Sequence, residues 1–117
     1  MIRPLAFAPL LLLVGCAGVR PQTTSAPASP GSLDCALAEV TGLGYTVEAA
    51  APDVFFKAER ARNALAYDVL NASVAGGTLR VAASMEVRDE DGRRPQGPSR
   101  SARSDAESVV GRCGAGA

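Results

Sequence analysis

The chain has 117 residues, with 12 basic and 12 acidic side chains and no histidine. The balanced charge gives no electrostatic basis for binding nucleic acid, and the lack of histidine removes the commonest general base and the commonest metal ligand. A chain of this length has room for one compact domain.

The first 15 residues have the three parts of a secretory signal peptide. Arg3 supplies the positive charge, residues 5–14 form an apolar run, and Gly15 is the small residue before a cleavage point. The run is interrupted by Pro9 and is shorter than the roughly 20 apolar residues of a bilayer span. We therefore expect residues 1–15 to be removed.

The end of this run, Leu13-Val14-Gly15-Cys16, resembles the lipobox of bacterial lipoproteins. In that family the cysteine receives a diacylglycerol, the chain is cleaved before it, and the new N-terminus is acylated. The resemblance implies cleavage between Gly15 and Cys16, lipid on Cys16, and the membrane as a partner. Ala17, in place of aspartate, implies the outer membrane facing the periplasm in preference to the inner membrane. A plain secretory signal cleaved after Ala17 or Gly18 is the alternative.

Residues 16–32 lack large apolar residues apart from Val19 and are rich in Pro, Ser and Thr, which predicts a flexible tether. Residues 33–114 then form the folded domain. Once Cys16 carries lipid, Cys35 and Cys113 remain, and an even pair in an oxidising compartment favours a disulfide. Two buried free thiols are the alternative. Without histidine or C-x-x-C spacing we expect neither a metal site nor a redox dithiol.

Helical spacing of apolar residues predicts a first helix that Ser32 caps and that Gly42 and Gly44 end. Alternation predicts strands at 45–49, 54–60, 67–75 and 78–88, with the last two joined by a Gly76-Gly77 turn.

Residues 89–103 are predicted to form a long polar loop. A capping box formed by Ser104 and Glu107 then predicts a second helix that Gly114 ends.

This order predicts an α+β two-layer sandwich, with a four-stranded antiparallel sheet and the N- and C-terminal helices on one face (order α-β-β-β-β-α). Over residues 34–113 the Gly-Tyr-Thr-Val and Phe-Lys-Ala-Glu-Arg strands resemble those of small uncharacterised bacterial lipoproteins. That resemblance implies no particular activity.

Four residues are candidates for an interaction surface. Phe55 and Phe56 are adjacent on a strand and point to opposite faces, so only one of them can enter the core. The other lies in a partner interface, in an apolar ligand groove or under the long loop. For Arg60 and Arg62, with Glu59, the favoured interpretation is a solvated strand without a function, and the alternative is an interaction patch on an exposed sheet edge.

These features favour a non-catalytic, cofactor-free lipoprotein of the cell envelope that docks onto another envelope component. An enzyme is not expected, because the chain has no histidine to act as a general base and contains no recognisable catalytic motif. The alternative is a periplasmic carrier of a small molecule or lipid. A carrier requires more apolar residues on the strands than one layer of helices can cover.

Overall fold

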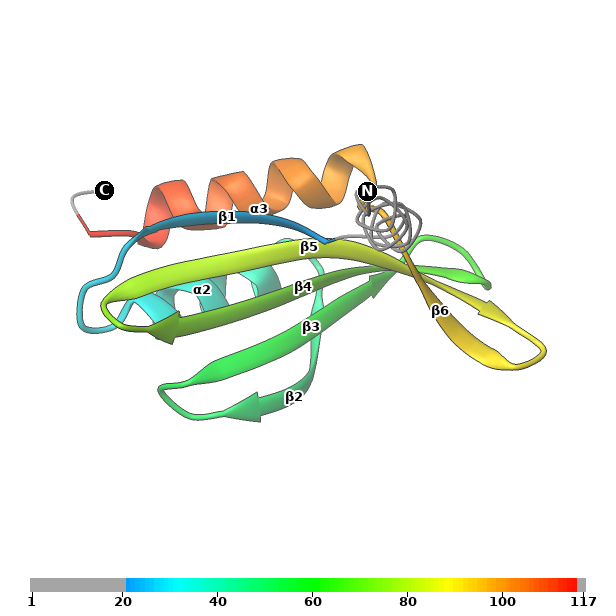
Figure 1. Cartoon of the computed structure of the whole chain (residues 1–117), viewed down its shortest axis with the longest axis horizontal. Helices are drawn as coiled ribbons and strands as arrows, with labels where there is room; N and C mark the ends of the chain where they lie inside the picture. The colour runs from blue at the N-terminus through cyan, green and yellow to red at the C-terminus, as the bar shows by residue number, and fades with distance from the viewer. Residues whose placement is uncertain (1–20, 116–117) are drawn as a thin grey trace, which may run out of the picture.

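The computed structural model describes residues 21–115, which form an antiparallel sheet and two helices (Figure 1). The elements are β1 (Gln22–Pro27), α2 (Ser32–Gly42), β2 (Thr46–Ala51), β3 (Phe55–Ala61), β4 (Ala66–Ala75), β5 (Thr78–Asp89), β6 (Gly92–Gln96) and α3 (Arg100–Cys113). The predicted signal peptide and Cys16 lie outside the described residues. Neither described helix combines the length and the apolar character of a membrane span.

The sheet has six strands in the order β1-β5-β4-β3-β2, with β6 also paired to β5, and every pair is antiparallel. The α+β class, the antiparallel sheet and the β4–β5 hairpin are as predicted. Gly76 and Gly77 both have positive φ values, 58° and 76°, which suits a two-residue hairpin turn. The predicted number of four strands was wrong, because β1 and β6 both add to β5.

The new strands lie in line along one edge of β5. β1, which lies within the predicted tether, pairs with residues 78–83 of β5. β6, which lies within the predicted 89–103 loop, pairs with residues 85–89 of β5. The free backbone groups of β5 supply the partners that these polar segments need. At the β5–β6 turn, the Asp91 amide donates to Asp89 Oδ1 (2.9 Å) and Gly92 has φ 114°.

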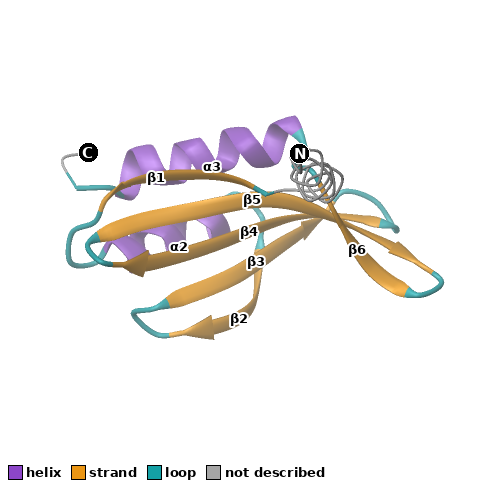
Figure 2. Cartoon of the chain, in the orientation of Figure 1, coloured by secondary structure: helices purple, strands orange, loops and turns teal. Residues whose placement is uncertain are grey.

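Both helices pack on one face of the sheet, and Figure 2 shows the strands in front of α2. The core joins alternate residues of the strands to the inner faces of both helices. Its fully buried members include Val40, Phe56, Leu70, Leu79, Val81 and Val109. No described helix covers the opposite face, which we call the open face.

Both helix starts differ from the prediction. Gly31 occupies the N-cap of α2, and Ser32 lies buried in the first turn, where its Oγ donates to the carbonyl of Cys113 (2.7 Å). α3 starts four residues before Ser104, because Ser99 accepts a hydrogen bond from the amide of Ala102 (3.1 Å). Ser104 is therefore inside the helix, and the predicted capping box was wrong.

A disulfide between Cys35 and Cys113 joins α2 to the end of α3, as predicted. The two Cα atoms are 5.5 Å apart and 78 positions apart in the sequence. The hydrogen bond from Ser32 to Cys113 lies beside it. The two helices, which come from opposite ends of the domain, are thus linked covalently over the core.

Candidate functional site

Arg60 and Arg62 lie on the helix-covered side of the sheet. Arg60 follows Phe56 and Ala58 at the two-residue spacing of one strand face, and both of those residues are buried. Glu59 points the other way. The alternative of one interaction patch formed by Arg60, Arg62 and Glu59 on an exposed edge was therefore wrong, because the three side chains do not share a face.

The two arginines converge on Asp68, whose side chain is 1% exposed. Asp68 accepts hydrogen bonds from Arg60 (3.1 Å), Arg62 (3.3 Å) and the hydroxyl of Ser99 (2.7 Å). The group that we call the Asp68 cluster consists of Tyr45, Arg60, Arg62, Asp68, Ser99, Ser101 and Asp105. A buried carboxylate needs such compensation, and here the partners bind β3, β4 and α3 together.

Arg60 is the centre of the cluster. It donates to the carbonyl of Leu43 (2.8 Å) and to Asp105 Oδ2 (2.9 Å), and its guanidinium lies 4.3 Å from the centre of the Tyr45 ring. The Tyr45 hydroxyl also donates to Asp105 Oδ2 (2.9 Å). Burial, helped by this hydrogen bond, raises the pKa of Tyr45 well above its ordinary value. The cluster thus satisfies its own charges and acts as a structural clamp.

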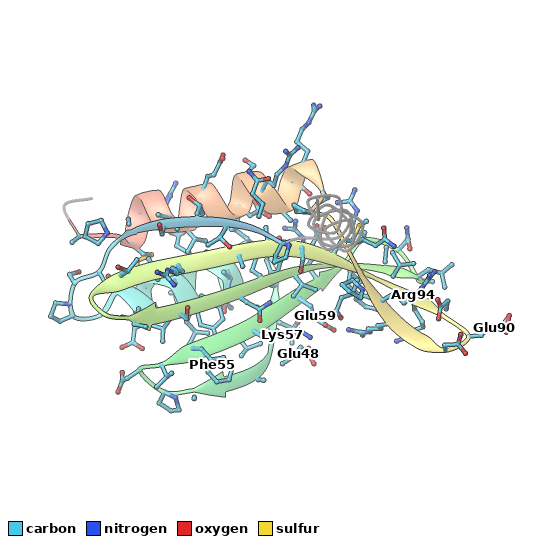
Figure 3. The ribbon with its side chains drawn as sticks, in the orientation of Figure 1. Glu48, Phe55, Lys57, Glu59, Glu90 and Arg94 are labelled. Carbon is cyan, nitrogen blue, oxygen red and sulfur yellow. A yellow bond between two sulfur atoms is a disulfide. The ribbon has the colours of Figure 1, made fainter. Side chains whose placement is uncertain are left out.

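Phe55 and Phe56 divide between the two faces as predicted. Phe56 is 2% exposed in the core, whereas Phe55 is 40% exposed on the open face, opposite Ser73 of β4. Figure 3 places Phe55 at one end of the molecule and the β5–β6 hairpin, with Glu90 and Arg94, at the other end. The 89–103 segment therefore does not bury Phe55, which was one of the predicted alternatives.

Ion pairs occupy the half of the open face near β6. Arg93 contacts Glu59 (2.6 Å) and Glu86 (3.3 Å), and Lys57 contacts Glu86 (3.2 Å). Val69 is opposite Glu59 in the sheet and only 1% exposed, so the long charged side chains shield it. Glu59 and Glu86 are therefore both already paired with cations.

The open face has an excess of positive charge. The alternate positions of β3 to β6 that share this face carry four cations (Lys57, Arg80, Arg88 and Arg93) and two acids (Glu59 and Glu86). β2 adds Glu48, which Figure 3 shows beside Lys57 and Glu59, so the net charge is plus one. Arg80 is exposed and lies directly across from Ser73, which pairs in turn with Phe55. Phe55, Ser73 and Arg80 thus form one row across three strands.

A hollow of about 300 Å³ lies on the same face where β1 meets β6. Its lining consists of Pro21, Asn71, Ala82, Ser84, Pro95 and Gln96. β1 pairs Gln22 with Ala83, so one further step of the register places Pro21 opposite Ser84. The chain therefore enters the sheet at the outer edge of β5, between the segments that pair with β1 and β6.

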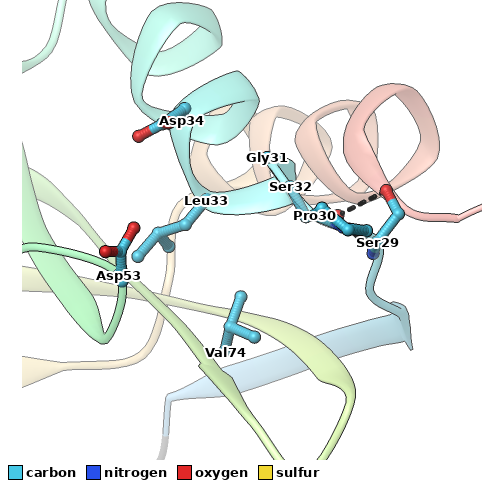
Figure 4. Close-up of a pocket in the computed structure, with 8 residues that line it drawn as sticks. All are labelled: Ser29, Pro30, Gly31, Ser32, Leu33, Asp34, Asp53 and Val74. Atoms are coloured by element: carbon cyan, nitrogen blue, oxygen red, sulfur yellow. Dashed lines mark hydrogen bonds between the residues drawn. The ribbon is translucent and has the colours of Figure 1, made fainter.

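A second hollow, of about 190 Å³, lies at the start of α2 (Figure 4). The hydroxyl oxygens of Ser29 and Ser32, which line it, are 3.3 Å apart. Asp34 and Asp53, which are far apart in the sequence, also line this hollow. Over residues 21–115 no group of three or more His, Cys, Asp or Glu side chains is arranged to hold a metal ion.

Tyr45, Asp68 and Asp105 were missed as partners of the candidate arginines. Asp68 could have been found, because it precedes Leu70 at the spacing of one strand face and must therefore be buried with it. Comparison with protein-family models, curated proteins and solved structures found no match for this chain. The functional argument therefore depends on the residues of this chain.

Proposed function

We propose that the protein is a lipid-anchored component of the cell envelope whose domain is a non-catalytic interaction module. The observation that carries the proposal is the Leu13-Val14-Gly15-Cys16 sequence behind an apolar run. The Cys35–Cys113 disulfide supports it, because such bonds persist in oxidising compartments such as the periplasm. The outer membrane, facing the periplasm, is the proposed location.

The fold supports the interaction role in a second way. The Asp68 cluster and the disulfide hold one face of the sheet and both helices together, whereas the open face is left without a cover. Phe55 is the one large apolar strand residue exposed on that face among those described. This composition favours docking on a surface over enclosure of an apolar ligand, so we prefer the interaction module to the carrier.

Intact mass of the protein extracted from membranes tests the anchor. We expect the mass of residues 16–117 plus lipid, with two thiols open to alkylation only after reduction. Cys16→Ser should remove the lipid, whereas the matched change Cys35→Ser should leave it in place. An unlipidated protein that lacks Cys16 would overturn the proposal.

A further inference from the structure

The connection between the proposed lipid and the sheet is short. Five residue steps separate Cys16 from Pro21, and an extended chain covers at most about 3.6 Å a step, which is roughly 18 Å in all. β5 alone has 12 residues and is about 40 Å long at the usual rise. The anchor therefore cannot hold the domain far from the bilayer, as a tether over residues 16–32 would have done.

The chain enters the sheet at the β5 edge, between the open face and α3. Pro21 lines the hollow on the open face together with Ser84 and Pro95. Gln22, the next residue, lines two small hollows with Arg103 and Glu107 of α3, and Figure 2 shows α3 running along β1. The short connection therefore brings both sides of this edge within about 18 Å of the lipid, and the side chains of each face must decide between them.

The charge and the exposed aromatic residue of the open face suit an anionic membrane surface. Its net charge is plus one, and among the described residues Arg80 and Arg88 belong to none of its ion pairs, so headgroup phosphates would meet these two cations. Phe55 and Arg80 stand in one row on either side of the small Ser73. An aromatic ring next to a cation is the combination that interfacial protein surfaces use.

We propose that the open face lies against the bilayer, with Arg80 on anionic headgroups and Phe55 in the interfacial layer. This inference rests on the proposed lipid anchor, because the anchor brings the face within reach of the membrane. It assigns the face to anionic lipid and not to a protein partner.

A tryptophan sensor tests the docking, because the chain contains no tryptophan. Full-length protein carrying Phe55→Trp is processed in a bacterial host, purified from membranes and reconstituted into vesicles of phosphatidylcholine and phosphatidylglycerol with brominated acyl chains. We expect strong quenching of its emission. Ser108→Trp is the control, since Ser108 is exposed on α3 and lies in none of the elements that form the open face.

Charge reversal tests the role of Arg80. In the Phe55→Trp background, Arg80→Glu changes the charge of the face by two units, so the ratio of docked to undocked protein should fall about tenfold or more. Arg112→Glu makes the same change on α3 and should leave quenching unaltered. Omitting phosphatidylglycerol or raising the salt concentration should mimic Arg80→Glu.

The outcomes separate the docking from the anchor. Failure of the protein to float with the vesicles contradicts the anchor and the docking with it. Flotation with equal quenching of the two tryptophan variants overturns the docking and leaves the anchor intact. Quenching that is unchanged by Arg80→Glu and by the omission of phosphatidylglycerol has the same meaning. Shielding of the Phe55→Trp side chain in native membranes but not in protein-free vesicles would assign the face to a protein partner and overturn the lipid assignment.

Discussion

Asp68 holds one end of the core together through charge. It is buried, yet it lies in line with Leu70 on the inner side of β4, where an apolar residue is usual. Arg60 and Arg62 make this position tolerable, and Ser99 extends the contact to the start of α3. The cluster therefore fixes how α3 sits on the sheet, and apolar contact alone would not specify that geometry as closely.

Removal of the Asp68 carboxylate should destabilise the fold. We expect Asp68→Ala to lower the free energy of unfolding by about 2–4 kcal/mol, somewhat less than for a fully buried pair, because Arg60 keeps 28% of its side-chain exposure. Urea unfolding followed by circular dichroism measures the loss. Glu90→Ala, in the exposed β5–β6 turn, is the control and should change little; similar midpoints for the two variants would contradict the clamp.

Tyr45 should make the stability depend on alkaline pH. Its pKa is raised in the folded state, whereas an unfolded tyrosine titrates near about 10. Its contribution is therefore complete below about pH 10 and is lost above it, since the unfolded chain then binds fewer protons than the folded one. Urea unfolding at about pH 9 and about pH 11 should show a larger loss for the wild type than for Tyr45→Phe. Equal losses would argue against a protonated Tyr45 in the fold.

At the scale of elements, the sequence was sufficient to predict those strands in which burial of one face produces a regular alternation of apolar and polar residues. Residues 78–88 alternate strictly between apolar and polar side chains and follow a Gly-Gly turn. The ends of β4 and β5 were therefore predicted to within one residue. β1 was missed because Gln22–Pro27 has no large apolar residue, and its pairing depends on an edge of β5 that only the folded sheet supplies. β6 was missed for the same reason, although Asp91-Gly92 was a turn signal.

The site was less predictable than the fold. The lipid site at Cys16 stays a prediction, whereas the division of Phe55 and Phe56 between two faces was predicted from sequence and is confirmed. Arg60 was placed on the wrong side because its charge was given more weight than its strand position, two residues after Ala58. Its partners Tyr45 and Asp105 lie 15 and 45 positions away in the sequence, and only the packing of α3 on the sheet brings them together.

The two possible starts of α3 make a matched prediction. Ser99→Ala should lower the free energy of unfolding by about 1 kcal/mol or more, since it removes the cap on Ala102 and the hydrogen bond to Asp68. Ser104→Ala lies in an exposed part of the helix and should stay within about 0.5 kcal/mol of the wild type. The reverse ranking in urea unfolding would restore Ser104 as the cap.

For the molecule as a whole, the disulfide closes a loop that contains nearly all of the sheet. Cys35 and Cys113 bracket β2 to β6, and β1 lies outside the loop, held by β5 and by a hydrogen bond from Ala115 to Pro27 (2.7 Å). The bond therefore protects the core strands more directly than it protects β1.

Reduction should lower the stability of the oxidised protein substantially. The chain-entropy estimate for a loop closed over 78 positions is about 4–5 kcal/mol. Urea unfolding with and without a reductant measures the effect, and the double variant Cys35→Ser/Cys113→Ser should not respond to the reductant. A wild-type midpoint that is the same in both conditions would contradict a stabilising disulfide.

β1 also determines how the domain would bear mechanical force. With Cys16 held in a membrane as proposed, any drag on the domain enters through Gln22, the first residue of β1. A pull along the strand loads the hydrogen bonds between β1 and β5 together, as shear, whereas a pull away from the sheet breaks them one after another. β1, which the sequence predicts to be part of a tether, would then be the strand whose pairing with β5 sets the force at which the domain begins to unfold.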